Sequence, residues 1–204
     1  MFDPGWLTLM AITDGLHDGI DGLVARATAA VRGGATCVQL RLKHADARTL
    51  VEVGRTLVDR VGAPVLVNDR LDVALACGAA GVHLGADDLP VHAARRIAPQ
   101  GFVIGASVGE TSEAAQAAQA DYVGVGPVYA TSSKLDAGDA IGIERFGELA
   151  RLSGRPAVAI GGITPENAAA TVAAGAAGVA IIRSVMSAAS PELAARQIRL
   201  AIGR

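Results

Sequence analysis

The chain has 204 residues, of which 51% are hydrophobic and 19% charged, and its formal net charge at pH 7 is -2. This length suits one or two domains, and the absence of any Lys/Arg cluster excludes the charge pattern of a protein that binds nucleic acid or an anionic membrane. The first ten residues contain an acid and a proline but no basic residue, and no apolar stretch reaches membrane-spanning length, so we expect a soluble, cytoplasmic protein without a secretory signal.

Short apolar segments alternate along the chain with longer Ala-, Arg- and Glu-bearing segments of helical period, a pattern typical of βα units around a buried parallel sheet. In chain order, the predicted strands lie at 7–13, 37–42, 64–68, 81–84, 102–107, 122–126, 157–161 and 178–182. Eight units with no room for a second domain predict an α/β fold, a (β/α)8 TIM barrel that forms a single domain over residues 1–204. An open doubly wound sheet is the alternative.

The last two helices are predicted from their first residues. Thr164 is followed by Pro165, and Ser190 is followed by Pro191. Ser and Thr are favoured as N-caps and proline is tolerated at the first helical position, so helices are expected to begin at both places.

Two cysteines, Cys37 and Cys77, lie within apolar segments. They have neither metal-ligand spacing nor the context of a disulfide-rich protein. We expect both to be buried structural thiols.

Polar residues follow the predicted strands at their C-terminal ends. In a barrel only these ends bring side chains from several strands to one place. Gln39, Arg41 and Lys43 are spaced by two, so their side chains would project to the same side of an extended segment. The later strands are followed by Asn68 and Asp69, by Asp87 and Asp88 after His83, by Ser107, by Thr131 to Lys134, by Gly161 and Gly162, and by Arg183 and Ser184. This shared placement predicts a functional site at one end of the barrel.

Each of these residues also has an ordinary structural interpretation. The alternatives are solvated loop residues for Arg41 and Lys43, helix capping for Asn68 and Asp69, a hydrogen-bonded core histidine for His83, and turn residues for Asp87 and Asp88. None of these alternatives explains why the residues follow successive strands.

The residue types indicate binding of phosphate groups. Gly161 and Gly162 lie between a strand and the helix expected at Thr164, where backbone N–H groups and the helix N-terminus favour an anion. Barrels of this kind commonly bind a phosphate there, together with the loop after the eighth strand. Asp69 and Asp88 are two carboxylates after adjacent strands, which suits Mg2+.

A second anionic group is indicated by the run Thr131, Ser132, Ser133 and Lys134. Hydroxyl groups and an ammonium can donate hydrogen bonds to several phosphate oxygens, and small residues up to Gly138 would let the loop close over a substrate. A polar flexible loop is the alternative. A phosphate site beside a metal-assisted pyrophosphate site implies two anionic substrates, one of which loses pyrophosphate.

The segments "AITD", "VQLRLK", "VNDRLDVAL", "AAGVHLGADDLP", "IGAS", "ADYVGVGPVYATSSK", "AIGGIT" and "GAAGVAII" together resemble the thiamine phosphate synthase family over nearly the whole chain. The resemblance implies a (β/α)8 barrel that joins hydroxymethylpyrimidine pyrophosphate to hydroxyethylthiazole phosphate and releases pyrophosphate. It also implies a dissociative reaction, in which pyrophosphate leaves before the thiazole nitrogen captures a carbocation, without a protein nucleophile. We expect small phosphorylated molecules as partners, neither nucleic acid nor membrane, and leave open a homo-oligomer.

The resemblance also implies a role for each matching residue. Gln39 and Asn68 would bind the pyrimidine substrate, Arg41 and Lys43 its pyrophosphate, Asp69 and Asp88 a Mg2+ ion, Gly162 the thiazole phosphate, and Thr131, Ser133 and Lys134 the phosphate groups, with Ser107 at the reacting centre. Arg183 and Ser184 are further candidates beside the phosphate site. The catalytic residues would be Arg41, Lys43, Ser107 and Lys134.

The chain departs from the family pattern at four positions: the family usually has Glu at Leu42, Gln at Ala86 and His at Gly109, and often Ser at Arg183. Two alternative functions remain. One is a thiazole tautomerase, a related isomerase with a histidine at the position of Pro127 and without the carboxylates Asp69 and Asp88. The other is a non-catalytic protein that binds a phosphate ligand.

Overall fold

The eight predicted strands form a closed parallel barrel in the computed structural model, which describes residues 2–131 and 138–203. The strands are β1 (Leu9–Ile12), β2 (Cys37–Leu40), β3 (Val65–Asn68), β4 (Gly81–Leu84), β5 (Val103–Val108), β6 (Tyr122–Val125), β7 (Ala157–Ile160) and β8 (Gly178–Ile181). Each strand pairs in parallel with the next, and β1 pairs with β8. The barrel prediction is confirmed, and the open sheet is excluded.

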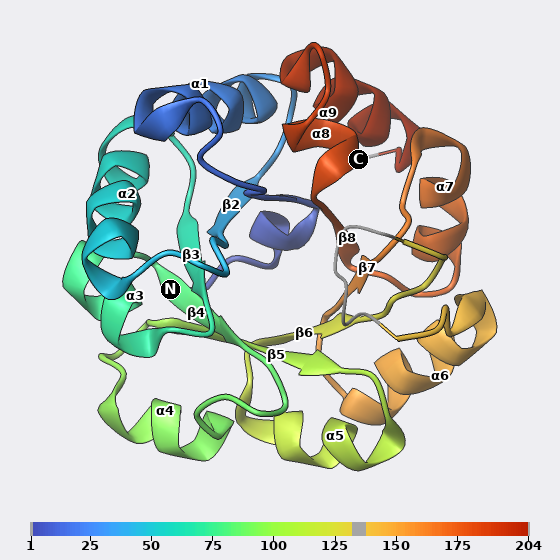
Figure 1. The fold of residues 1–204 in the computed structure, drawn as a ribbon. Helices are drawn as coiled ribbons and strands as arrows, with labels where there is room; N and C mark the ends of the chain where they lie inside the picture. Colours follow the sequence, from blue (N-terminus) through green and yellow to red (C-terminus); the bar gives the residue numbers. More distant parts are fainter. Residues whose placement is uncertain (1, 132–137, 204) are drawn as a thin grey trace.

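Helices surround the barrel as an outer ring (Figure 1). They are α1 (Gly19–Arg32), α2 (Ala47–Arg60), α3 (Leu71–Cys77), α4 (Val91–Ile97), α5 (Thr111–Gln116), the short 3-10 helix η2 (Ala117–Gln119), α6 (Gly142–Ser153), α7 (Pro165–Ala173), α8 (Arg183–Met186) and α9 (Pro191–Ala201). Within the described part of the chain, none of them is long and apolar enough to cross a membrane.

Both predicted helix starts are confirmed. α9 begins at Pro191, and the side chain of Ser190 accepts a hydrogen bond from the backbone N–H of Leu193 at 3.3 Å. α7 begins at Pro165, where the backbone N–H of Thr164 donates to Asn167 Oδ1 at 2.9 Å. These bonds satisfy N–H groups that have no partner within a helix.

Apolar side chains form two layers. The larger lies between the strands and the helices, and the smaller fills the barrel with Leu7, Met10, Ile12, Cys37, Leu66, Val103, Tyr122, Val158 and Ala180. The two cysteines are buried and free, as predicted, and burial raises the pKa of the Cys37 thiol to about 12. Burial therefore keeps the Cys37 thiol protonated at neutral pH.

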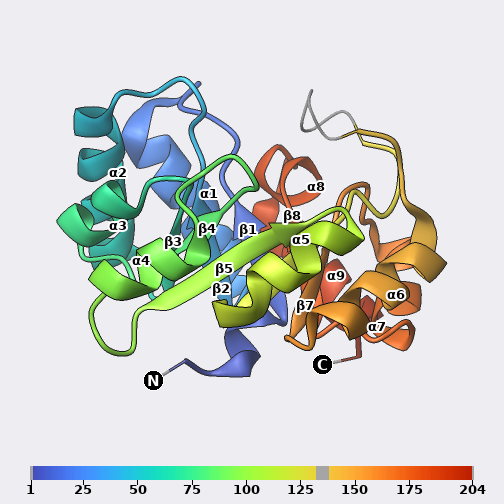
Figure 2. The ribbon, with the colours of Figure 1, turned by 90° about the horizontal axis from the view of Figure 1, so that it is seen from below.

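One end of the barrel is closed by the chain before β1. The sequence predicted a strand from Leu7, but Pro4–Leu7 forms the 3-10 helix η1 instead. Asp3 caps this helix by accepting a hydrogen bond from the backbone N–H of Gly5 at 2.8 Å, and Leu7 packs into the smaller apolar cluster. Figure 2 shows both termini at this end and the loops after the strands at the opposite end, which we call the mouth.

Candidate active site at the barrel mouth

A cavity of about 760 Å³ opens at the mouth and is lined by residues of all eight strands or the loops that follow them. Its volume lies within the usual range for small-molecule sites. It is lined by these predicted site residues: Gln39, Arg41, Lys43, Asn68, Asp69, Asp88, Ser107, Thr131, Gly162, Arg183 and Ser184. The structure therefore brings together every predicted site residue that it describes. Two further predicted residues, Ser133 and Lys134, lie outside the described residues, as does the rest of the loop 132–137.

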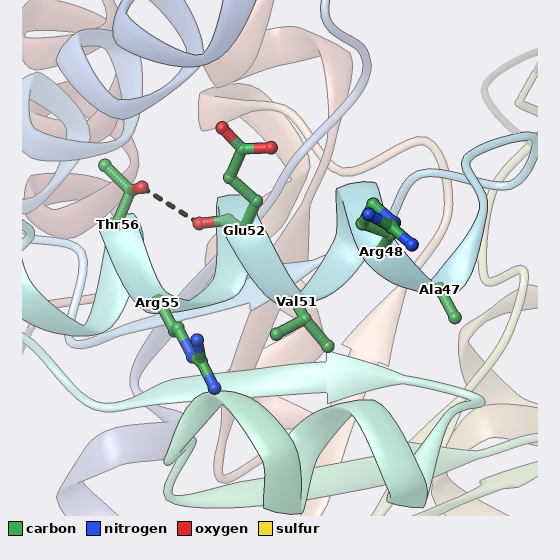
Figure 3. A pocket seen from close by; sticks show the side chains of 6 residues that line it. All are labelled: Ala47, Arg48, Val51, Glu52, Arg55 and Thr56. Atoms are coloured by element: carbon green, nitrogen blue, oxygen red, sulfur yellow. Dashed lines mark hydrogen bonds between the residues drawn. The ribbon is translucent and has the colours of Figure 1, made fainter.

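A separate depression lies on the outer face of α2 (Figure 3). It is formed by one helix alone, and Thr56 Oγ1 there donates to the backbone carbonyl of Glu52 at 2.9 Å, a local bond within the helix. None of the residues predicted to bind substrate lines it. The mouth, where several strands converge, is the candidate active site.

Thr13 fixes the backbone that carries Arg41. The fully buried Thr13 hydroxyl accepts a hydrogen bond from the backbone N–H of Arg41 at 2.8 Å and donates to its carbonyl oxygen at 3.1 Å. The backbone N–H of Thr13 also donates to the carbonyl of Gln39 at 2.9 Å. The loop after β2 is therefore tied to β1, and the side chains of Arg41 and Lys43 both line the cavity.

Asp69 has a left-handed backbone, with a φ of 64°, which is uncommon for a residue other than glycine. Its N–H donates to the carbonyl of His83 at 2.7 Å, so the end of β3 is held against β4. The residue before α3 is Arg70, and its side chain makes no capping bond. Such conformations often mark functional sites.

Asp88 lies after β4 and helps to shape its own loop. Asp88 Oδ2 accepts a hydrogen bond from the backbone N–H of Gly85 at 2.6 Å, whereas Asp87 is exposed. Among the residues that the structure describes, no group of three or more His, Cys, Asp or Glu could hold a metal. Two carboxylates at one cavity still suit Mg2+, which usually takes one or two carboxylates and leaves its other positions to water and phosphate.

The loop after β7 requires its two glycines. Gly161 and Gly162 have φ values of 97° and 63°, and a Cβ at Gly162 would lie 2.6 Å from the carbonyl oxygen of Ala130. Asn167 Nδ2 donates to the carbonyl of Gly162 at 2.9 Å, which fixes the loop beside the start of α7. The positive end of the α7 dipole, which favours an anion, therefore lies next to the cavity lining.

The loop after β8 contacts the loop between β7 and α7 beside the cavity. Ser184 Oγ donates to the carbonyl of Ile163 at 3.3 Å, which ties the start of α8 to the β7–α7 loop. Arg183 is exposed and lines the cavity, so it places a positive charge at the mouth.

The sequence did not predict the contact between His83 and Tyr122. His83 is half-buried and lines the cavity, with Nδ1 at 3.0 Å from the Tyr122 hydroxyl and Nε2 at 3.1 Å from Ser107 Oγ. Tyr122 is 1% exposed, and burial raises its pKa well above the usual range. The alternative of a hydrogen-bonded histidine is thus correct for His83, but its partners belong to the site.

A closed (β/α)8 barrel with its polar residues gathered at the C-terminal mouth is the architecture of a barrel enzyme. Within that class, the family model described as thiamine monophosphate synthase matches residues 9–185. The chain belongs to this family.

Similar proteins agree with this assignment. The chain is 45% identical to the thiamine-phosphate synthase of Moorella thermoacetica over 98% of both chains, and 50% identical to that of Methanoculleus marisnigri over 83% of both. A solved thiamine phosphate pyrophosphorylase from Pyrococcus furiosus is 38% identical, with a TM-score of 0.86 over 98% of this chain and 97% of that one. These matches confirm the resemblance drawn from the sequence and support thiamine phosphate synthase, a transferase, as the function.

Proposed function

We propose that this chain joins hydroxymethylpyrimidine pyrophosphate to hydroxyethylthiazole phosphate at the barrel mouth, with release of pyrophosphate and with Mg2+ as cofactor. One observation carries this proposal: cationic, carboxylate and glycine residues that follow separate strands all line one cavity. The polar lining residues form two groups, one after β2, β3 and β4 and the other after β7 and β8. These two sets of strands lie on different parts of the barrel ring. Two anionic substrates can therefore be bound apart.

The pyrophosphate would bind on the side of β2, β3 and β4. Arg41 and Lys43 supply positive charge there, and the Thr13 hydroxyl holds the backbone of Arg41 in place. Asp69 and Asp88 would hold the Mg2+ ion, which neutralises negative charge on a bound pyrophosphate.

The thiazole phosphate would bind on the side of β7 and β8. The support is the fixed Gly162 loop beside the N-terminus of α7, with Arg183 and Ser184 from the neighbouring loop. A guanidinium can form two parallel hydrogen bonds with a phosphate, so Arg183, where the family often has Ser, would strengthen anion binding.

The reaction needs no protein nucleophile. The bond between the methylene carbon and the pyrophosphate oxygen breaks, and its electron pair leaves with pyrophosphate. The lone pair of the thiazole nitrogen then forms the new carbon–nitrogen bond. Arg41 and Lys43 stabilise the charge that develops on the leaving group, and loss of one such interaction costs about 3 to 4 kcal/mol in other enzymes.

Two of the four departures from the family pattern, Leu42 and Ala86, lie differently with respect to the cavity. Leu42 is half-buried and packs against the larger apolar layer, so a polar residue is replaced there by a packing contact. Ala86 is exposed and lines the cavity. The loss of a side chain at Ala86 would leave its loop with fewer contacts to the pyrophosphate.

The test is direct. Purified protein is supplied with both substrates and Mg2+, and thiamine phosphate and pyrophosphate are measured. Arg41→Ala should lower kcat/KM by roughly 100-fold or more. Arg48→Ala is the matched control, because Arg48 lies on the outer face of α2 and should leave the rate unchanged (Figure 3). A folded wild-type protein that forms no product would refute the proposal.

A further inference from the structure

We propose that His83 is a positioning residue of this site: held by the buried hydroxyl of Tyr122, its imidazole donates a hydrogen bond to Ser107 Oγ and fixes the direction of the Ser107 hydroxyl. This inference rests on the proposed function, in which Ser107 lies at the reacting centre. His83 would act through Ser107 and not on the reacting atoms.

Strand register brings the three side chains together. His83 on β4 pairs with Gly105 on β5, and Gly105 pairs with Tyr122 on β6. Paired residues in adjacent strands project to the same face of a sheet, so the two rings flank a residue without a side chain. Ser107 lies two residues further along β5, toward the mouth, and projects to that face as well.

Glycine is required between the rings. A Cβ at Gly105 would lie 2.2 Å from Tyr122 Cζ, and a Cβ at Gly124 would lie 3.0 Å from His83 Cε1. The ring centroids of His83 and Tyr122 are 5.5 Å apart with an interplanar angle of 33°. The local sequence of three strands therefore makes room for this pair of rings.

The hydrogen bonds run from the barrel interior to the cavity. The Tyr122 hydroxyl is 3.0 Å from His83 Nδ1, and His83 Nε2 is 3.1 Å from Ser107 Oγ. Tyr122 is almost fully buried, and all three residues contribute to the cavity lining. His83 therefore links the buried phenol of Tyr122 to the Ser107 hydroxyl.

The direction of donation follows from the burial of Tyr122. Its hydroxyl lies 3.0 Å from His83 Nδ1, and a buried O–H without an acceptor is costly, so the phenol proton is donated to His83 Nδ1. A neutral imidazole that accepts at Nδ1 carries its proton on Nε2 and donates it to Ser107 Oγ. The proton of Ser107 is thereby directed to an acceptor in the cavity.

The functional consequence is a fixed donor. A serine hydroxyl without this partner can rotate among several directions, and a small misplacement at a reacting centre lowers the rate by up to about 100-fold. Since His83 does not bind either phosphate group in this account, its loss should lower kcat more than it raises KM.

The kinetic test is a double-mutant cycle. His83→Phe keeps an aromatic ring but removes both nitrogens, and we expect kcat to fall roughly 10- to 100-fold, with KM for each substrate changed less. Ser107→Ala combined with His83→Phe should be no slower than Ser107→Ala alone. Losses that multiply would overturn the inference. His92→Phe is the matched control, because His92 lies on α4 and is exposed, and its rate should equal that of the wild type.

His83→Gln is the conservative variant, and it keeps the test possible if His83→Phe misfolds. In His83→Gln, the amide N–H can donate near the position of Nε2–H, so kcat should recover part of the loss measured in His83→Phe. If His83→Phe does not fold, Tyr122→Phe and His83→Gln carry the comparison. A rate in Tyr122→Phe equal to that of the wild type, with an unchanged tautomer of His83, would overturn the inference.

A second readout does not depend on activity. Nitrogen-15 NMR of histidine-labelled protein, with the His83 signals assigned by their absence in His83→Gln, should show the neutral Nε2–H tautomer. The Nδ1–H tautomer in an active wild-type enzyme would overturn this inference alone. An inactive wild type would overturn the proposed function, and with it the role of His83 in the reaction, whichever tautomer is found.

Discussion

The Asp88 carboxylate accepts a hydrogen bond from the backbone N–H of Gly85 at 2.6 Å, within the loop that follows β4. The side chain that would help to bind Mg2+ therefore also holds its own loop in shape. The turn role considered for Asp88 from the sequence and the proposed metal role are compatible, because only Oδ2 is engaged by Gly85. A test must separate the charge of the side chain from its bond to the loop.

Asp88→Asn makes this separation. The amide oxygen can still accept from Gly85, so the loop should keep its shape, but the negative charge is lost. The Mg2+ concentration at half-maximal rate should rise by roughly tenfold or more, which corresponds to about 1.4 kcal/mol. Asp59→Asn is the matched control, because Asp59 is exposed on α2 and does not line the cavity, and it should titrate as the wild type does. An unaltered Mg2+ titration in Asp88→Asn would exclude Asp88 as a ligand.

Gly105→Ala should destabilise the barrel. Its Cβ would lie 2.2 Å from Tyr122 Cζ, and the Tyr122 ring is buried in the core. Overpacking of this kind costs about 1 to 3 kcal/mol, measured as the free energy of unfolding in urea. Gly15→Ala serves as the control, since its Cβ would meet only His17 Nδ1, at 3.8 Å. Equal stabilities of the two variants would show that the rings can move aside.

Ser190→Ala should weaken the start of α9. Ser190 Oγ accepts the N–H of Leu193, and this bond is lost with the hydroxyl. Loss of an N-cap costs about 1 kcal/mol in typical cases, whereas Ser190→Asp should retain most of the stability. Urea unfolding of the three proteins checks the order, and an alanine variant as stable as the wild type would contradict the capping role.

Asp18 should contribute to a pH-dependent part of the stability. The hydrogen bond from Arg26 lowers the pKa of Asp18 below its usual range. Because the folded pKa is the lower one, the stabilisation is full above the unfolded pKa and is lost as the pH falls through the folded pKa. The difference in Tm between the wild type and Asp18→Asn should therefore shrink toward zero in acid. A difference that does not vary with pH would contradict this account.

The sequence predicted the arrangement of the strands better than the contacts inside the barrel. Periodicity located all eight strands, and the placement of residues such as Arg41 and Asp69 after strands predicted their convergence. Local patterns could not predict that Leu7 lies in a 3-10 helix, because the barrel interior it fills is formed by strands distant in the sequence. The signal for the His83 and Tyr122 contact was the glycine between them, which becomes visible only once three strands are in register.

The most direct test of the central claim is a crystal structure of the protein soaked with pyrophosphate and Mg2+. We expect density for the anion at the mouth, in contact with Arg41 and Lys43, and density for an ion bound by Asp69 and Asp88. Pyrophosphate bound away from the mouth, or an ion that contacts neither carboxylate, would contradict the account.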